Sequence, residues 1–327
     1  MINLETQYMG LKLKNPIIIA SSGLTNSVEK IKDLEKAGAG AIVLKSIFEE
    51  QINNEVNNQI NRSPQHLFPE EEDFTWNFTR NKLITGHLNL LSEAKKETEI
   101  PIIASVSCMA ASEWVVFAKD LENGGADALE LNLFFIPTDP QKTSEEIEQI
   151  YLRIVSEVRK NVKIPISVKI GFYYSNLIGM ASKLAASGAD ALVLFNRFYE
   201  PDINLDKLEL TTSEVFSEPE DIRRSMRWIG LISSQLPNVQ IAAGTGIHDG
   251  EAVIKQLLVG AQVTQICSSV YINGSQVIGG MIADLTAFMK KRHFKRIEDF
   301  RGLLSHKNIS NPAIYERAQF MKYFEGK

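Results

Sequence analysis

The chain has 327 residues, 44% of them hydrophobic, and a formal net charge of −5. This composition supplies a large core, and the length suits a single domain with loop insertions. The acidic balance and scattered basic residues argue against a nucleic-acid surface, no apolar run reaches the roughly 20 residues of a membrane span, and the N-terminus lacks a signal-peptide pattern. With only two cysteines, Cys108 and Cys267, we expect a cytoplasmic protein with free thiols.

Short apolar runs recur along the chain, and each ends on small or polar residues. In chain order they cover residues 17–23, 41–46, 102–107, 128–132, 166–170, 191–196, 239–246 and 263–269. Each run is too short for a helix and rich in Val, Ile and Leu, which is typical of a strand buried on both faces. Amphipathic stretches such as 27–36, 145–162 and 249–258 lie between them. The pattern predicts an α/β fold, a (β/α)8 TIM barrel, as one domain over residues 1–327.

Four junctions share a local pattern that runs from a helix end through Gly into a strand. They lie at 37–46, 123–132, 186–196 and 258–269. Glycine can take a left-handed conformation after the last helical turn and so end the helix. Such turns are common in α/β barrels in general, so the repetition supports the fold rather than a function.

Two insertions and a tail complete the predicted organisation. Glu49–Phe78 follows the second strand and Arg197–Arg227 follows the sixth. Both leave the C-terminal face of the barrel, where loops shape substrate pockets, although either could be surface elaboration. The tail after the last strand is expected to be helical over 277–292, again over 297–306, and in a final stretch to Tyr323.

The strand ends supply the candidate functional residues. They are Ser22, Lys45, Ser107, Asn132, Lys169, Asn196, Gly246 and Ser268. In a barrel these ends share one mouth, which is where active sites lie.

The last two strand ends carry the most specific pattern. A Gly-Thr-Gly turn, residues 244–246, ends the seventh strand just before a helix, and Ser268 and Ser269 end the eighth. Backbone amides and hydroxyls from two adjacent loops can converge on one anion, and many barrels hold a phosphate here. The alternative is a tight turn without a ligand.

Two lysines lie among buried strand residues. Lys45 and Lys169 should not face the core unless they are paired, so we expect both to face the mouth. A cation beside the N1–C2 carbonyl edge of a flavin would stabilise the reduced anion. The alternative for each is a solvated lysine at the barrel rim.

The order of these motifs resembles the dihydroorotate dehydrogenase family, closest to its soluble class 1 members, over about residues 3–305. The matching segments are NPIIIASSG, LKS, SVS, ELN, SVKI, LFN, GTGI, GAQVTQI and DFRG. The resemblance implies an FMN-dependent oxidoreductase that oxidises dihydroorotate to orotate in pyrimidine biosynthesis. It also implies a cytoplasmic homodimer, with a small-molecule substrate and neither a nucleic-acid nor a membrane partner.

The resemblance also assigns roles to residues of this chain. Lys45, Asn132 and Lys169 would be catalytic, with Lys169 at the flavin N1 edge. The cofactor-binding residues would be Ser21, Ser22, Gly23, Lys45, Ser46, Asn132, Lys169, Asn196, Gly244, Thr245, Gly246, Ser268 and Ser269.

The chain departs from the family pattern where the substrate would react. In the family an Asn-Leu-Ser motif or a close variant leads into a Cys or Ser that acts as general base, but here the run is Asn-Leu-Phe-Phe and Phe135 occupies the base position. Pro137 replaces the asparagine expected two residues later. The family's Asn-rich loop after the second strand is not recognisable, and Asn77 and Asn81 are its imperfect candidates.

Phenylalanine cannot accept a proton, so other bases must be considered. Cys108, Tyr173, Tyr174 and His248 lie just past strand ends or in the predicted phosphate loop, although each also suits ordinary packing or a solvated position. No spacing of the five His and two Cys suggests a metal site. Three hypotheses stay open: a dihydroorotate dehydrogenase, a related flavin oxidoreductase with another planar substrate, and a flavin-binding protein without turnover.

Overall fold

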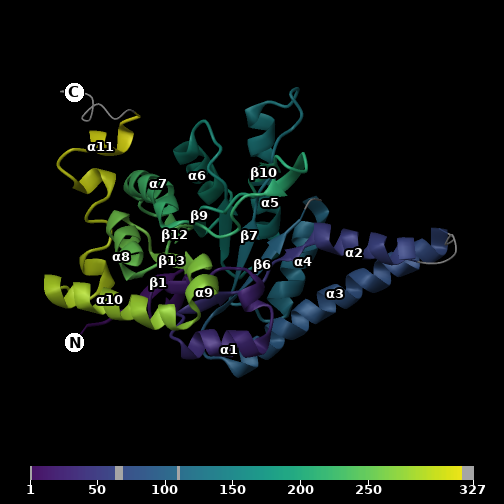
Figure 1. Cartoon of the computed structure of the whole chain (residues 1–327), viewed down its shortest axis with the longest axis horizontal. Helices are drawn as coiled ribbons and strands as arrows, with labels where there is room; N and C mark the ends of the chain where they lie inside the picture. Colours follow the sequence, from purple (N-terminus) through teal and green to yellow (C-terminus); the bar gives the residue numbers. More distant parts are fainter. Residues whose placement is uncertain (1, 63–68, 109–110, 319–327) are drawn as a thin grey trace.

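Parallel strands close into a barrel in the computed structural model, which describes residues 2–62, 69–108 and 111–318 (Figure 1). Eight described strands form it: β3 (Ile17–Ile19), β4 (Ala41–Val43), β6 (Ile102–Ser107), β7 (Ala128–Asn132), β8 (Ile166–Ile170), β9 (Ala191–Leu194), β12 (Gln240–Gly244) and β13 (Val263–Ile266). Each pairs in parallel with the next, and β13 pairs with β3 to close the ring. The predicted strands and the TIM-barrel fold are confirmed.

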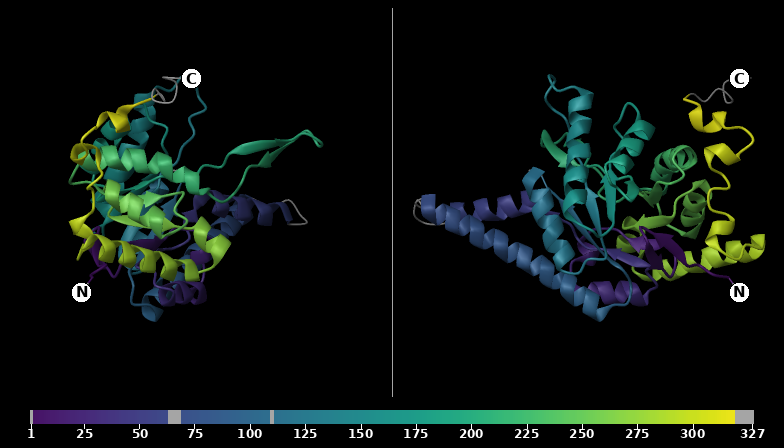
Figure 2. Two further views of the ribbon diagram at one scale, coloured as in Figure 1. Left: turned by 60° about the vertical axis from the view of Figure 1, so that its left-hand side comes forward. Right: turned by 180° about the vertical axis from the view of Figure 1, so that it is seen from behind.

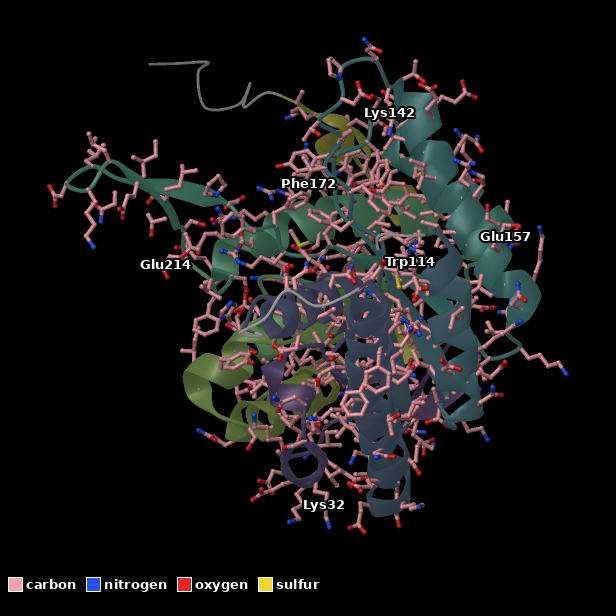
Figure 3. All side chains as sticks on the ribbon, turned by 90° about the vertical axis from the view of Figure 1, so that its right-hand side faces the viewer. Lys32, Trp114, Lys142, Glu157, Phe172 and Glu214 are labelled. Carbon is pink, nitrogen blue, oxygen red and sulfur yellow. The ribbon has the colours of Figure 1, made fainter. Side chains whose placement is uncertain are left out.

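Helices cover the outside of the barrel, as Figure 2 shows from two further sides. They are α1 (Val28–Lys36), α3 (Pro69–Glu97), α4 (Ala111–Asn123), α5 (Ser144–Asn161), α6 (Leu177–Ala186), α7 (Ile222–Gln235), α8 (Gly250–Val259) and α10 (Gln276–Arg292). Their apolar faces pack on the outward-facing strand residues in one large core. In Figure 3, Trp114 lies inside this layer, whereas Lys32 and Glu157 lie at the edge of the molecule.

The N-terminal end of the barrel is closed by an antiparallel hairpin of β1 (Thr6–Tyr8) and β2 (Leu11–Leu13). Tyr8, Met9 and Leu13 are buried in one cluster with inward-facing apolar residues of the strands. Because this end is filled by side chains, the mouth at the C-terminal ends of the strands is where a ligand can enter.

The four repeated junctions contain glycines in the left-handed region. Gly38, Gly125, Gly188 and Gly260 have φ between 91° and 120°. Residues with a Cβ atom rarely adopt this conformation, so glycine ends each helix and turns the chain into the next strand. This part of the sequence prediction is confirmed.

The first insertion is a pair of long helices. The chain continues from β5 (Ile47–Phe48) into α2 (Glu49–Arg62) and returns along α3, and the pair projects far from the barrel (Figure 1). Only the second half of α3 covers the barrel, beside α1 and α4.

The second insertion is a β-ribbon. The strands β10 (Pro201–Asn204) and β11 (Glu209–Thr212) pair antiparallel, with Ile203 opposite Leu210. The ribbon extends away from the molecule in the left view of Figure 2. The chain then returns across the mouth of the barrel before α7.

The tail corrects one prediction. The helix expected at 277–292 is present as α10, but the next stretch forms only the short 3₁₀ turns Ile297–Asp299 and His306–Asn308. Gly302 has φ 76°, and its N–H, like that of Leu304, bonds to the end of α8 instead of continuing a helix. Further on, α11 covers only Ala313–Glu316, and the rest of the predicted helix to Tyr323 extends beyond the described residues.

Candidate active site

A cavity of about 500 Å³ lies in the mouth, between the ends of β3, β8, β9, β12 and β13. Much of the predicted cofactor site lines it: Ser21, Ser22, Lys169, Asn196, Gly244, Thr245, Gly246 and Ser268. Its remaining lining includes two cavity-wall aromatic rings, those of Phe216 and Tyr271, which stack with centroids 5.4 Å apart. We call it the donor cavity, because its lining is rich in hydrogen-bond donors.

The lining of the donor cavity is rich in hydrogen-bond donors. It contains two cationic side chains, Lys169 and Arg197, several hydroxyls and a glycine loop, and no Asp or Glu is among its described lining residues. A low-dielectric cavity with such a lining favours an anionic ligand. The donor chemistry and the stacked rings therefore fit a planar molecule that carries a phosphate.

The Gly-Thr-Gly turn is held by the second insertion. Thr245 and Gly246 both have positive φ, 70° and 76°. The Gly246 N–H donates to Ser217 Oγ at 3.3 Å, and the Ser217 N–H donates to Ser268 Oγ at 3.0 Å. His248 Nε2 lies 3.1 Å from Ser217 Oγ, so this predicted candidate base contacts the loop rather than the cavity.

Lys169 is paired beneath the cavity with a buried carboxylate. Its Nζ lies 3.8 Å from Glu130 Oε1 and 3.5 Å from Gln265 Oε1. Gln265 Nε2 donates to the other carboxylate oxygen of Glu130 at 2.5 Å. Glu130 is 1% exposed and lies inside the barrel near Tyr8, whose pKa is raised by burial and by the Glu130 charge. Lys169 thus lies between the donor cavity and the Glu130 carboxylate inside the barrel.

The remaining predicted residues lie just outside the cavity lining. Ser46 hydrogen-bonds to Ser21, its backbone N–H donating to Ser21 Oγ at 2.9 Å, and so fixes a lining residue. Asn132 accepts a hydrogen bond of 2.9 Å from Asn196, which does line the cavity. Gly23 lies close to the Tyr271 hydroxyl.

Lys45 and Ser269 also lie outside this lining. Lys45 Nζ turns to Gln51 Oε1 at 3.3 Å, at the base of α2. The Ser269 hydroxyl is fully buried and has no hydrogen-bond partner among the described residues, although Ser268 beside it lines the cavity. A buried hydroxyl without a partner destabilises the folded protein, and a ligand that hydrogen-bonds to Ser269 would remove this cost.

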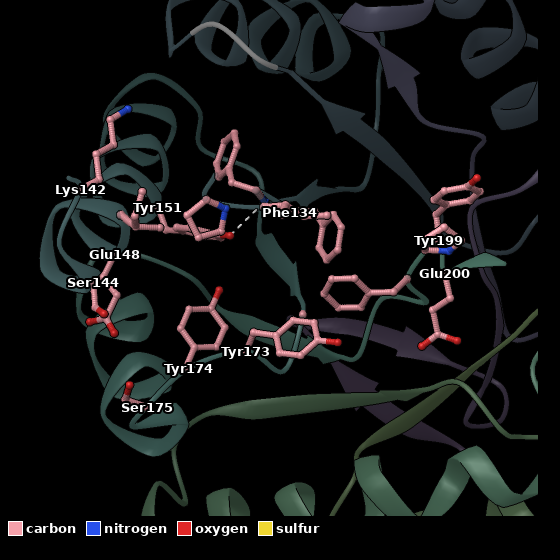
Figure 4. A pocket seen from close by; sticks show the side chains of 17 residues that line it. Phe134, Lys142, Ser144, Glu148, Tyr151, Tyr173, Tyr174, Ser175, Tyr199 and Glu200 are labelled. Atoms are coloured by element: carbon pink, nitrogen blue, oxygen red, sulfur yellow. Dashed lines mark hydrogen bonds between the residues drawn. The ribbon is translucent and has the colours of Figure 1, made fainter. Parts of the chain in front are cut away.

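The residue at the base position faces away from the donor cavity. The Phe135 ring packs edge-to-face on Tyr151, with centroids 5.2 Å apart. The Phe135 N–H donates to the Tyr151 hydroxyl at 3.0 Å, and a dashed line marks this hydrogen bond in Figure 4. Phe135 lines a second cavity instead.

The other candidate bases do not reach the donor cavity either. Burial raises the pKa of the Cys108 thiol, helped by the nearby Glu49 carboxylate, so it stays protonated and inert. Burial likewise raises the pKa of Tyr174, and Tyr173 lies with it at the second cavity. Asn77 and Asn81 lie on α3 and are not among the residues that line the donor cavity.

The structure adds cavity residues that the sequence did not suggest. Phe216 and Ser217 come from the irregular part of the second insertion, which carries no local motif. Cys267 lines the donor cavity too, and burial raises the pKa of its thiol. Glu130 could have been noticed, because a charged residue within a buried strand must find a partner.

In the part of the chain that the structure describes, no three His, Cys, Asp or Glu side chains gather as a metal site would require. No helix there is both long and apolar enough to cross a membrane.

The barrel and its donor cavity define a class of protein: (β/α)8 barrels with a donor-rich cavity at the C-terminal ends of their strands. Residues 3–289 match the dihydroorotate dehydrogenase family, and the chain belongs to this family of flavin-dependent oxidoreductases that act on CH–CH bonds.

Relatives match over nearly the whole chain. It is 27% identical to "Dihydroorotate dehydrogenase B (NAD(+)), catalytic subunit" of Thermoplasma volcanium, with 93% of this chain and 99% of that protein covered. It is 25% identical to the protein of the same name from Methanothermobacter thermautotrophicus, with 92% and 98% covered. It is also 25% identical to "Putative dihydroorotate dehydrogenase A (fumarate)" of Aeropyrum pernix, with 91% and 96% covered.

Proposed function

We propose that this protein is an FMN-dependent oxidoreductase that converts dihydroorotate to orotate in pyrimidine biosynthesis. The observation that carries the proposal is the donor cavity, which joins the Gly-Thr-Gly loop to a largely buried lysine and has no Asp or Glu among its described lining residues. The names of the relatives support the same substrate.

Each part of the cavity suits one part of FMN. Thr245, Gly246, Ser268 and Ser269 would hold the phosphate through hydroxyls and backbone amides. The stacked Phe216 and Tyr271 rings offer an apolar wall for a planar ring system. Bound FMN would supply a hydride acceptor at this site.

The chain's own residues would orient the substrate and stabilise charge. Lys169 would present its cation to the ring edge where negative charge develops, since Glu130 and Gln265 hold it from below. The Asn132–Asn196 amide pair would orient a ring that has carbonyl and N–H groups, because an amide both donates and accepts.

Anaerobic reduction tests the proposal. Dihydroorotate added to FMN-loaded protein should bleach the flavin band near about 450 nm. Orotate, which has no hydride to give, is the matched control and should leave the band unchanged. Absence of bleaching with dihydroorotate at every pH tested would contradict the proposed substrate.

A second candidate is oxidation or reduction of a different planar substrate, favoured by Phe135 at the base position. Loss of a positioned base costs about 10²–10⁴ in rate, so a reaction that needs only hydride transfer suits this chain better. Phe135→Cys should then change which compounds reduce or oxidise the flavin, with Phe135→Leu as the control for lost ring volume. An unchanged substrate profile in Phe135→Cys would show that this position does not set specificity.

We also propose a cytoplasmic homodimer, which the resemblance to class 1 enzymes implies. Two relatives are named catalytic subunits, which supports a further electron-transfer partner as well. Sedimentation equilibrium should give twice the chain mass of 36.6 kDa. A monomer at micromolar concentration would rule out a stable dimer.

A further inference from the structure

A second cavity, of about 520 Å³, lies beside the mouth, between the loops after β7, β8 and β9 and the start of α5 (Figure 4). We call it the aromatic cavity. Its aromatic lining consists of Phe134, Phe135, Tyr151, Tyr173, Tyr174, Phe198 and Tyr199. Its volume lies within the range of about 300–1,000 Å³ that small-molecule sites occupy.

The aromatic cavity is separate from the donor cavity. The two share no lining residue, and rings of Phe134 and Phe198 meet edge-to-face, with centroids 4.1 Å apart, between the β7 and β9 loops. Each ring lies two residues beyond one of the hydrogen-bonded pair Asn132 and Asn196. An aromatic pair therefore follows directly on the polar pair that borders the donor cavity.

Glycine makes room for this aromatic pair. A Cβ atom on Gly171 would lie 2.9 Å from Phe198 Cζ and 3.1 Å from Phe134 Cε2. Both rings thus pack against a backbone without a side chain, at the end of β8. A side chain at this position would therefore collide with both rings.

The inner end of the aromatic cavity offers one hydrogen-bond donor. Tyr151 Oη accepts from the Phe135 N–H at 3.0 Å, so its own phenol proton can be donated to a ligand. The Tyr174 hydroxyl belongs to the same lining, and Figure 4 shows both hydroxyls at the cavity.

The outer end of the aromatic cavity exposes large apolar side chains to solvent. Ile136, Tyr173 and Tyr199 are 65%, 68% and 66% exposed and belong to the lining of the cavity. Such a concentration of exposed apolar surface at the edge of a concave site is typical of a ligand-binding entrance.

We propose that the aromatic cavity binds a flat aromatic molecule that carries a carbonyl oxygen. The rings of the lining favour an aromatic ligand, whose edges and faces they can meet, and the spare phenol proton favours an acceptor oxygen. Such a group is either an aromatic extension of a substrate whose reactive ring lies in the donor cavity, or a separate small molecule. The binding itself does not rest on the proposed function, because the two cavities share no lining residue.

Calorimetric titration with 2-acetonaphthone tests the proposal. Ile147 lines the cavity from α5, whereas Gln149, on the same helix, is exposed and outside it. Ile147→Trp should fill the cavity and weaken binding by at least about tenfold, whereas Gln149→Trp, the matched control, should bind as the unmodified protein does. Equal binding to the two variants, or no binding to the unmodified protein, would overturn the proposal.

Two further titrations test the ligand chemistry and its place. The hydrocarbon 2-ethylnaphthalene has nearly the same shape without the carbonyl and should bind about two- to tenfold more weakly than 2-acetonaphthone; equal affinity would refute the hydrogen bond. Binding of 2-acetonaphthone in the presence of saturating orotate supports a site separate from the donor cavity, whereas competition would place the probe in the donor cavity and overturn the proposal. If the protein binds 2-acetonaphthone but dihydroorotate does not bleach its flavin, the proposed aromatic site is supported and the proposed substrate is refuted.

Discussion

Replacing Lys169 by methionine should destabilise the protein through Glu130 rather than through lost contacts of the lysine itself. The carboxylate is 1% exposed, and the Lys169 ammonium is the cation that pairs with it in the described structure. Methionine keeps the length of the side chain and removes only the charge. Glu130 would then be buried with the Gln265 amide as its remaining hydrogen-bond donor.

The magnitude follows from the cost of an uncompensated buried charge. Removing one partner of a buried ion pair typically costs about 3–5 kcal/mol. At roughly 2.1 cal/mol/K of unfolding entropy per residue, a chain of 327 residues would lose about 4–7 °C in Tm. The double variant Lys169→Met with Glu130→Gln should recover most of this loss, because it removes both charges and keeps an acceptor for Gln265.

Thermal unfolding of the flavin-free protein measures the effect. The two single variants and the double variant form a cycle, and we expect a coupling of about 0.5–3 kcal/mol. If the double variant were as unstable as the sum of the two single variants, the Glu130–Lys169 pairing would be refuted.

The double variant also isolates the role of Lys169 toward the flavin. Because it restores stability without restoring the cation, any remaining loss of FMN affinity or slowing of flavin reduction is due to the missing charge. Unchanged affinity and reduction rate in this variant would show that Lys169 does not act at the flavin edge.

Three further predictions concern other parts of the molecule. Gly246→Ala should greatly weaken FMN binding, measured by equilibrium dialysis, because the residue has φ 76° and its added Cβ would collide with the backbone at Ile222; wild-type affinity would contradict the close packing of this loop. Gly86→Ala, on α3 with open space around it, should raise unfolding stability by about 0.5–1 kcal/mol, and a loss would contradict the helix there. Burial, together with the Lys45 charge, lowers the pKa of His87 from 6.5 to about 4. Between these two pH values the histidine is protonated in the unfolded chain but not in the folded protein, so the free energy of unfolding should fall as pH drops from 6.5 toward 4. His87→Gln should flatten the pH dependence of Tm in this window, and an identical slope would contradict the assignment.

The barrel was predictable because its signals are local. A buried parallel strand needs a short run of apolar residues, and a helix end that turns sharply needs glycine, so both can be read from a few neighbouring positions. Gly38 and Gly188 show this, since each has the positive φ that its junction predicted. The tail after α10 lacked such a signal, because its backbone bonds to α8, which lies far away in the sequence.

The candidate site was predictable only where a strand end carries its own motif. Thr245, Gly246 and Ser268 follow directly on strands and reach the donor cavity as expected. Ser217 reaches the same loop after a ribbon and an irregular segment, and its contact with Gly246 spans 29 positions of sequence separation. Nothing in the residues around Ser217 indicates that contact.

The direction of a loop side chain could not be predicted from the sequence either. The sequence identifies Phe135 as the residue at the base position, but the structure turns its ring toward Tyr151 and out of the donor cavity.

The residues of the donor cavity and those of the aromatic cavity come from different parts of the barrel. The glycine loop, the serines and the lysine of the donor cavity come from β3, β8, β12 and β13, and the Glu130–Gln265 pair supports the lysine from inside the barrel. The aromatic residues come from the loops after β7, β8 and β9. Because strands of a barrel are held by backbone pairing, loops can change while the strand interior stays fixed. This separation explains how one chain can combine a donor cavity at the strand ends with an apolar cavity around Phe135.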